Sequence, residues 1–135
     1  MRESAVRQLV VPMSDRPMVK LAEATDNPDD QGAYWELISR ESNGASEFCI
    51  GIGRFDPGEV HPPHNHPHAA EFYLMTAGRA RLIIGDEVRE IGPGTAVYIP
   101  RGTRHGVSNP YDETATMVYG FDRPSFSECG NVWVD

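Results

Sequence analysis

The segment Gly58–Gly78, GEVHPPHNHPHAAEFYLMTAG, holds four of the five histidines in the chain. Within it, one residue separates His64 from His66, and Glu71 follows after four more. Positions i and i+2 of an extended strand face the same side, so His64 and His66 can present two imidazoles to one ion. The link 67–70 then turns the chain, which lets Glu71 enter from the next strand and add an anionic oxygen. This spacing indicates a metal site.

A second segment, Gly94–Asn109 (GTAVYIPRGTRHGVSN), supplies one further histidine, His105, at the end of a predicted strand–turn unit. The two segments together offer three imidazole nitrogens and one carboxylate oxygen. Such mixed ligation suits divalent Fe, Mn, Ni, Co or Zn, and the general order of metal affinities does not select among them. We therefore expect one divalent transition metal ion, whose identity the residues leave open.

These two segments resemble the two signature motifs of the cupin superfamily, with every fixed position of the usual patterns occupied from Gly58 to Asn109. The resemblance implies an all-β fold, an antiparallel double-stranded β-helix or jelly-roll barrel. Its interior would hold the metal on four side chains, which are His64, His66, Glu71 and His105. It does not imply one reaction, because cupins include dioxygenases, decarboxylases, isomerases, lyases and non-catalytic binding proteins.

Composition indicates a single small acidic domain over residues 1–135. That length suits one hydrophobic core and is too short for two, and thirteen glycines and eleven prolines suit many turns between strands. The net charge of −8 disfavours binding to nucleic acid or to an anionic membrane, so we expect a small-molecule substrate. Two cysteines without CxxC spacing, the lack of a secretory signal and the lack of an eighteen-residue apolar run predict a cytoplasmic protein.

The region before the barrel is predicted to be an N-terminal extension, residues 1–32, followed by a barrel core over 33–135. In the extension we expect an arm over 1–16, where Val10 and Val11 could add an edge strand. A first short strand is predicted over 17–22. The polar run over 25–32 that follows it is expected to form a loop that buries no side chain.

Strands separated by short turns are predicted for the barrel core. Strands over 33–40 and 46–55 are joined by a turn with Asn43-Gly44, a strong hairpin signal. Either face of the second strand could line the interior. Further strands are expected over 80–84, 87–91, 95–99, 114–121 and 131–134, and no helix is predicted.

Three other side chains are considered for the site. Tyr73 lies two residues after Glu71, on the same strand face, where it could act as a general acid or base or simply pack against the wall. This Glu-x-Tyr arrangement is similar to that of some dimethylsulfoniopropionate lyases, in which a tyrosine beside the metal acts as base. His61 breaks the motif spacing and is expected in an exposed loop, although it could carry protons at the mouth. Arg54 could anchor a substrate carboxylate, but an arginine that extends to solvent or pairs with a neighbouring acid is favoured.

The predicted function is that of a metal-dependent enzyme acting on a small, polar, carboxylated or oxygen-rich substrate, by dioxygenase, lyase or isomerase chemistry. The alternative is a non-catalytic binding or sensor module, whose output would need a separate protein because no DNA-binding motif is evident. The resemblance also implies a homodimer, with the N-terminal arm or an edge strand as a plausible contact.

Overall fold

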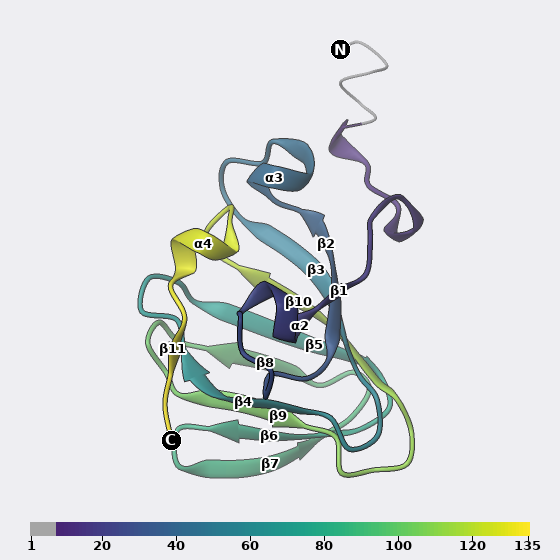
Figure 1. Cartoon of the computed structure of the whole chain (residues 1–135), viewed down its shortest axis with the longest axis vertical. Coiled ribbons are helices and arrows are strands. Elements are labelled where there is room, and N and C mark those ends of the chain that lie inside the picture. The colour runs from purple at the N-terminus through teal and green to yellow at the C-terminus, as the bar shows by residue number, and fades with distance from the viewer. Residues whose placement is uncertain (1–7) are drawn as a thin grey trace.

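Two antiparallel sheets face each other in the computed structural model, which describes residues 8–135 (Figure 1). The larger sheet has the strand order β1-β2-β3-β10-β5-β8 and the smaller β11-β4-β9-β6-β7. The all-β prediction and the jelly-roll arrangement are confirmed. The strands are β1 (Val19–Lys20), β2 (Ala33–Ile38), β3 (Cys49–Phe55), β4 (Val60–Asn65), β5 (Glu71–Ala77), β6 (Ala80–Ile84), β7 (Glu87–Ile91), β8 (Ala96–Ile99), β9 (His105–Ser108), β10 (Ala115–Phe121) and β11 (Val132–Trp133).

Alternating burial along the strands shows which face of each strand lines the interior. In β5, Tyr73 and Met75 are buried whereas Phe72 and Leu74 are exposed, as the period of two in a strand requires. In β3, the face that begins with Cys49 is buried, which decides between the two faces that the sequence left open.

The main core fills the space between the sheets. Full burial of a valine, leucine, isoleucine, phenylalanine or methionine side chain in this core contributes about 1.5–3 kcal/mol. Its members are Phe55, Tyr73, Met75, Ala80, Leu82, Ile91, Val97, Ile99, Val107, Ala115 and Met117. A smaller cluster, which contacts the ring of His66 through Phe121, contains Cys49, Ala69, Phe121 and Cys129.

Short helices interrupt the barrel, so the prediction of no helix is wrong. They are the 3-10 helix η1 (Met13–Asp15) and the four-residue helices α2 (Leu21–Ala24), α3 (Arg40–Asn43) and α4 (Phe126–Cys129). In α3, the Ser39 hydroxyl accepts the first-turn N–H of Ser42 at 2.9 Å, and Gly44 closes the helix at φ 77°. The Asn43-Gly44 signal thus ends a helical turn between β2 and β3 instead of forming a tight hairpin.

The N-terminal extension also differs from its prediction. The first strand is only β1, because α2 begins directly after it, and Val10 is exposed and outside any strand. Residues 1–7 of the predicted arm lie outside the described part of the chain. The polar loop after α2 was expected to bury nothing, yet the side chain of Asp30 within it is fully buried.

The outer face of the larger sheet carries exposed apolar side chains, among them Phe72, Leu74 and Tyr98. Such a surface suits contact with a second copy of the chain, and the homodimer stays a prediction. Over the described residues, no helix combines the length and apolar character needed to cross a membrane.

Candidate metal centre

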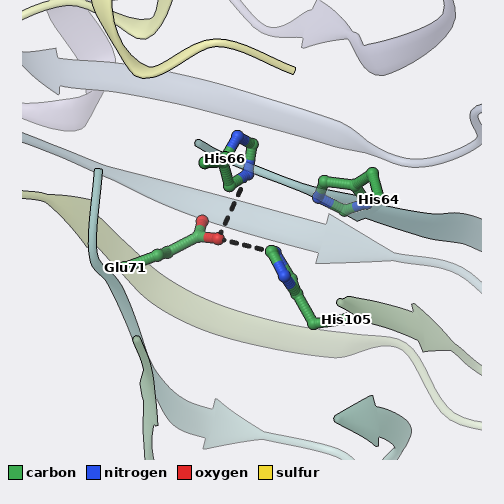
Figure 2. Close-up of side chains that lie close together, drawn as sticks. All are labelled: His64, His66, Glu71 and His105. Carbon is green, nitrogen blue, oxygen red and sulfur yellow. Dashed lines mark hydrogen bonds and ion pairs between the residues drawn. The ribbon is translucent and has the colours of Figure 1, made fainter. Parts of the chain in front are cut away.

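The side chains of the predicted metal site converge from both sheets. His64 lies in β4, His66 directly follows that strand, and His105 begins the neighbouring strand β9, where it pairs with His64. Glu71 begins β5 in the opposite sheet. One potential ligand atom from each of the four residues lies within 4.8 Å of the others, and all four side chains are buried (Figure 2). The sequence therefore identified a real cluster.

Main-chain carbonyl groups set the tautomer of all three imidazoles. A carbonyl oxygen can only accept a hydrogen bond, so each Nδ1 must carry the proton and each Nε2 keeps a lone pair when the ring is neutral. The Nδ1 atoms donate to Pro62 O from His64 at 2.7 Å, to Gly130 O from His66 at 2.7 Å and to Thr103 O from His105 at 2.8 Å.

The Nε2 atoms of the imidazoles and the carboxylate of Glu71 face one another across a short distance. Glu71 Oε1 lies 2.9 Å from Nε2 of His105 and 3.5 Å from Nε2 of His66 (Figure 2). Three neutral imidazoles and a carboxylate bring only lone pairs to this point, so a shared cation is required. That cation is either a metal ion or protons on the rings, and the donor set fits a divalent transition metal with open coordination positions.

The pKa values of the metal-free cluster reflect two opposing effects, burial of the charged groups and the contacts between them. Burial raises the pKa of Glu71, but its hydrogen bonds with His105 and His66 outweigh burial and hold that pKa below the ordinary value. Burial lowers the pKa of His66, but its contact with Glu71 outweighs this, and the net shift is upward. Burial and the neighbouring histidines hold the pKa of His64 far below its usual range, so this ring stays neutral. A metal ion bound here would replace the protons that the cluster otherwise shares.

Comparison with known proteins identifies the family. A family model for the cupin domain matches residues 51–121. The chain belongs to the cupin family. The dimethylsulfoniopropionate lyase DddW of Ruegeria pomeroyi is 34% identical to this cupin over 113 residues, which cover 83% of this chain and 72% of that protein. Protein SchB of Streptomyces halstedii is 30% identical over 83 residues, covering 62% of this chain and 60% of SchB.

Solved structures agree with this assignment. The polyketide cyclase RemF from Streptomyces resistomycificus superposes with a TM-score of 0.66 at 26% identity, covering 77% of this chain and 71% of that one. The cupin family thus includes relatives with quite different names, and the reaction has to be inferred from the residues around the cluster.

A cavity of about 80 Å³ adjoins the cluster and contains the predicted proton-transfer residue Tyr73. Tyr73 is 3% exposed and shares the inward face of β5 with Glu71, as predicted. Burial raises the pKa of Tyr73 well above its ordinary value, and the charges of Glu71 and Asp30 add to the effect. Without a metal the phenol stays protonated and can donate a hydrogen bond.

His61 is not the exposed loop histidine that was expected. It lies in β4, its side chain is 13% exposed, and it lines the same cavity. Residues three apart in a regular strand face opposite sides, but the pairing of β4 with β9 shifts register between His61 and His64, so both rings turn inward. Their ring centroids are 4.2 Å apart. His68 is exposed.

A buried carboxylate orients His61. Asp30 Oδ1 lies 2.5 Å from Nδ1 of His61, and Asp30 Oδ2 accepts the hydroxyl of Thr25 at 2.9 Å. Because Nδ1 donates to the carboxylate, Nε2 of His61 is left as the free ring nitrogen. Sequence reasoning missed Asp30, since a polar loop with Pro and Gly gives no sign that one of its carboxylates is buried.

Arg54 is excluded from the cavity, in agreement with the favoured prediction. Its guanidinium lies over the ring of Trp35, 5.3 Å from the centroid, and its Nε is 3.6 Å from Asp56 Oδ1. No lysine or arginine is found among the described residues that line the cavity.

Sequence reasoning also missed the part of the cavity wall that extends toward β2, three strands from Glu71 in β5, which is called the far end below. It is lined by Tyr34 and Glu36 of β2 and by Tyr119 of β10. A possible signal was present, because the Tyr-x-Glu pair of β2 lies opposite the Gly51-x-Gly53 pair of β3. Two glycines facing two larger side chains across a strand pair leave room for a cavity, but this pairing cannot be read from the sequence alone.

Proposed function

We propose that this cupin is a metal-dependent lyase that holds a small carboxylated substrate on a divalent ion bound by its three histidines and Glu71. The observation that carries the proposal is the convergence of four buried acceptor groups whose tautomers are set by main-chain carbonyls. When bound, the ion supplies Lewis acidity, which polarises a carboxylate oxygen and stabilises negative charge that develops on the substrate.

Tyr73 is placed to move a proton at the substrate. It is on the same inward face as Glu71, two positions along β5, and it lines the cavity into which the metal-binding groups open. Its hydroxyl has no hydrogen-bond partner among the described residues, so it is available to a substrate. A cation at the cluster lowers the cost of forming the phenolate, which favours a general-base role.

His61 is a second proton carrier in the proposal. Asp30 fixes its ring and its tautomer, and Nε2 is the nitrogen that can accept a proton. This use of a buried carboxylate to orient an imidazole is found in many acid–base sites. His61 would accept the proton from Tyr73 or from product and return it to solvent at the mouth.

The reaction that these groups support is a β-elimination. The base takes a proton from the carbon next to the carboxylate, the electron pair of that C–H bond forms a carbon–carbon double bond, and the bond to the leaving group at the next carbon breaks. The leaving group departs with the electron pair of its bond. The 34% identity with a protein named dimethylsulfoniopropionate lyase supports this reaction type.

The test is turnover by protein loaded separately with Fe(II), Mn(II), Ni(II), Co(II) or Zn(II). The substrates are propionates with different leaving groups at carbon 3, including dimethylsulfoniopropionate, and the unsaturated acid is measured together with oxygen consumption. We expect the unsaturated acid to form without oxygen uptake, and His105→Ala to lack this activity. Oxygen-dependent turnover would instead indicate a dioxygenase. Metal and ligand binding without turnover on any substrate would favour the binding-module alternative.

A further inference from the structure

The far end of the cavity is built on one row of paired residues that starts in β2, three strands from the strand of Glu71. Glu36 of β2 lies opposite Gly51 of β3, and Gly51 lies opposite Tyr119 of β10. A Cβ atom on Gly51 would lie 2.4 Å from the hydroxyl of Tyr119, so that phenol lies over the glycine. The row continues to Tyr73 of β5. Glu36 and Tyr73 are therefore three strand spacings apart, about 14 Å along the sheet.

The charge at this end is negative. Glu36 is half-buried, and in the described part of the chain its carboxylate has no ion-pair or hydrogen-bond partner. Arg16 donates to the main-chain oxygen of Glu36 at 2.9 Å and not to the carboxylate. Burial raises the pKa of both Tyr34 and Tyr119, and the charge of Glu36 raises each further, so the two phenols stay neutral beside it.

Aromatic rings make up much of the surrounding wall. The rings of Tyr34 and Tyr119 meet edge to face with centroids 6.2 Å apart, and Tyr119 contacts Phe121 in the same way at 6.0 Å. A carboxylate among aromatic rings attracts an organic cation through both charge and cation–π contacts. Methylated cations suit this wall better than a primary ammonium, because they are less strongly hydrated and need no hydrogen-bond acceptors.

Size and the lack of basic side chains limit the ligand further. The void has a volume of about 80 Å³, so only a small head group fits at this end. A dimethylsulfonio or trimethylammonio group has only three or four non-hydrogen atoms. With no lysine or arginine on the described walls, a substrate carboxylate can be neutralised only at the metal end.

We propose that Glu36, Tyr34 and Tyr119 form a subsite for a small onium group, and that the substrate is a zwitterion with its carboxylate at the metal cluster. The inference rests on the proposed function for the carboxylate end, and adds the class of the leaving group at the other end. A tertiary sulfonium or quaternary ammonium group also leaves as a neutral molecule, so the elimination releases no second anion beside Glu36.

The test measures binding by calorimetry to protein loaded with Zn(II), which undergoes no redox reaction. The two ligands are 3-(trimethylammonio)propionate and its uncharged-head isostere 4,4-dimethylpentanoate, which have the same shape. We expect the onium ligand to bind at least tenfold more tightly. Glu36→Gln should abolish this preference by weakening only the onium ligand, whereas the exposed-residue control Glu23→Gln, with the same change in net charge, should keep it. Equal affinities in the wild type, or a preference that survives Glu36→Gln, would overturn the subsite.

A second measurement separates this inference from the proposed function. Tetramethylammonium is titrated into metal-free wild-type, Glu36→Gln and His105→Ala proteins and followed by the NMR signal of its methyl groups. We expect saturable binding in the wild type and in His105→Ala, and its loss in Glu36→Gln. Binding of this cation without metal-dependent binding of either carboxylate would leave the subsite and remove the proposed function. Metal-dependent carboxylate binding without any tetramethylammonium binding would do the reverse.

Discussion

The two ends of the cavity are built in different ways. At the metal end, three of the four groups come from the neighbouring strands β4 and β9 or their ends, and main-chain carbonyls within two residues hold two of the imidazoles. At the far end, the side chains come from β2 and β10, which contact each other only across glycines of β3. The first end depends on local spacing and the second on the register of three strands.

This difference predicts how each end responds to substitution. Loss of one group at the metal end removes a ligand without disturbing the strands that carry it. A change at the far end alters packing between strands, so it acts on stability and ligand selectivity while the metal cluster stays intact.

The largest effect is expected from loss of a metal ligand. Protein with His105→Ala should lose at least about a hundredfold in metal affinity, because even groups that only orient a ligand are worth 10–100-fold. Elemental analysis after gel filtration measures the bound metal, with His68→Ala as the control because that histidine is exposed. Equal metal content in wild type and His105→Ala would show that the cluster is not the binding site.

The next effect concerns turnover without loss of metal. Tyr73→Phe removes a single hydroxyl from the cavity, and turnover should fall by about 10²–10⁴, the usual contribution of a general acid or base. Metal content should not change, because the three histidines and Glu71 all remain in place. Tyr98→Phe is the matched control, since Tyr98 is 70% exposed. Normal activity of Tyr73→Phe would remove this tyrosine from the mechanism.

A smaller effect is expected at the far end, from a methyl group on β3. In Gly51→Ala the new Cβ would lie 2.3 Å from Trp35 O, so the strands and Tyr119 must shift, and overpacking of this kind costs about 1–3 kcal/mol of unfolding free energy. In the control Gly53→Ala the nearest atom, on Met117, is 3.4 Å away. Urea unfolding compares the two variants. Similar stabilities would mean that the far end is not tightly built, and loss of metal from Gly51→Ala would mean that the two ends are coupled.

The smallest effect is expected on the surface beside the metal end. Arg101 and Asp122 form an ion pair of 2.7 Å, and both side chains are nearly half exposed. Arg101→Gln should change the free energy of unfolding by less than about 1 kcal/mol and leave metal content unchanged, because solvent screens such pairs. Thermal unfolding with metal analysis checks both values. A larger loss of stability or of metal would show that this exposed ion pair, and not only the buried ligands, stabilises the metal end.

Much of the fold could be predicted from local pattern. The strands predicted over 80–84 and 87–91 are β6 and β7, which pair on either side of a short turn with Gly85 at φ 58°. The same kind of signal misled at Asn43-Gly44, because a glycine with positive φ closes a helical turn as readily as a hairpin. Local sequence indicates that the chain turns, but packing between the flanking strands decides by which route.

The sequence by itself indicated the barrel, the four clustered side chains and the inward face of Tyr73, because each of these shows as a short-range spacing within one of two motif segments, in strands of fixed period. Only the tertiary structure decided the rest of the cavity. The inward turn of His61 comes from a register shift against β9, and its partner Asp30 comes from a loop thirty-one positions away. Glu36 and Tyr119 line the same cavity because Gly51, which has no side chain, lies between them in β3. Contacts of this kind arise from strand register and from the space left by absent side chains, and neither has a local signature.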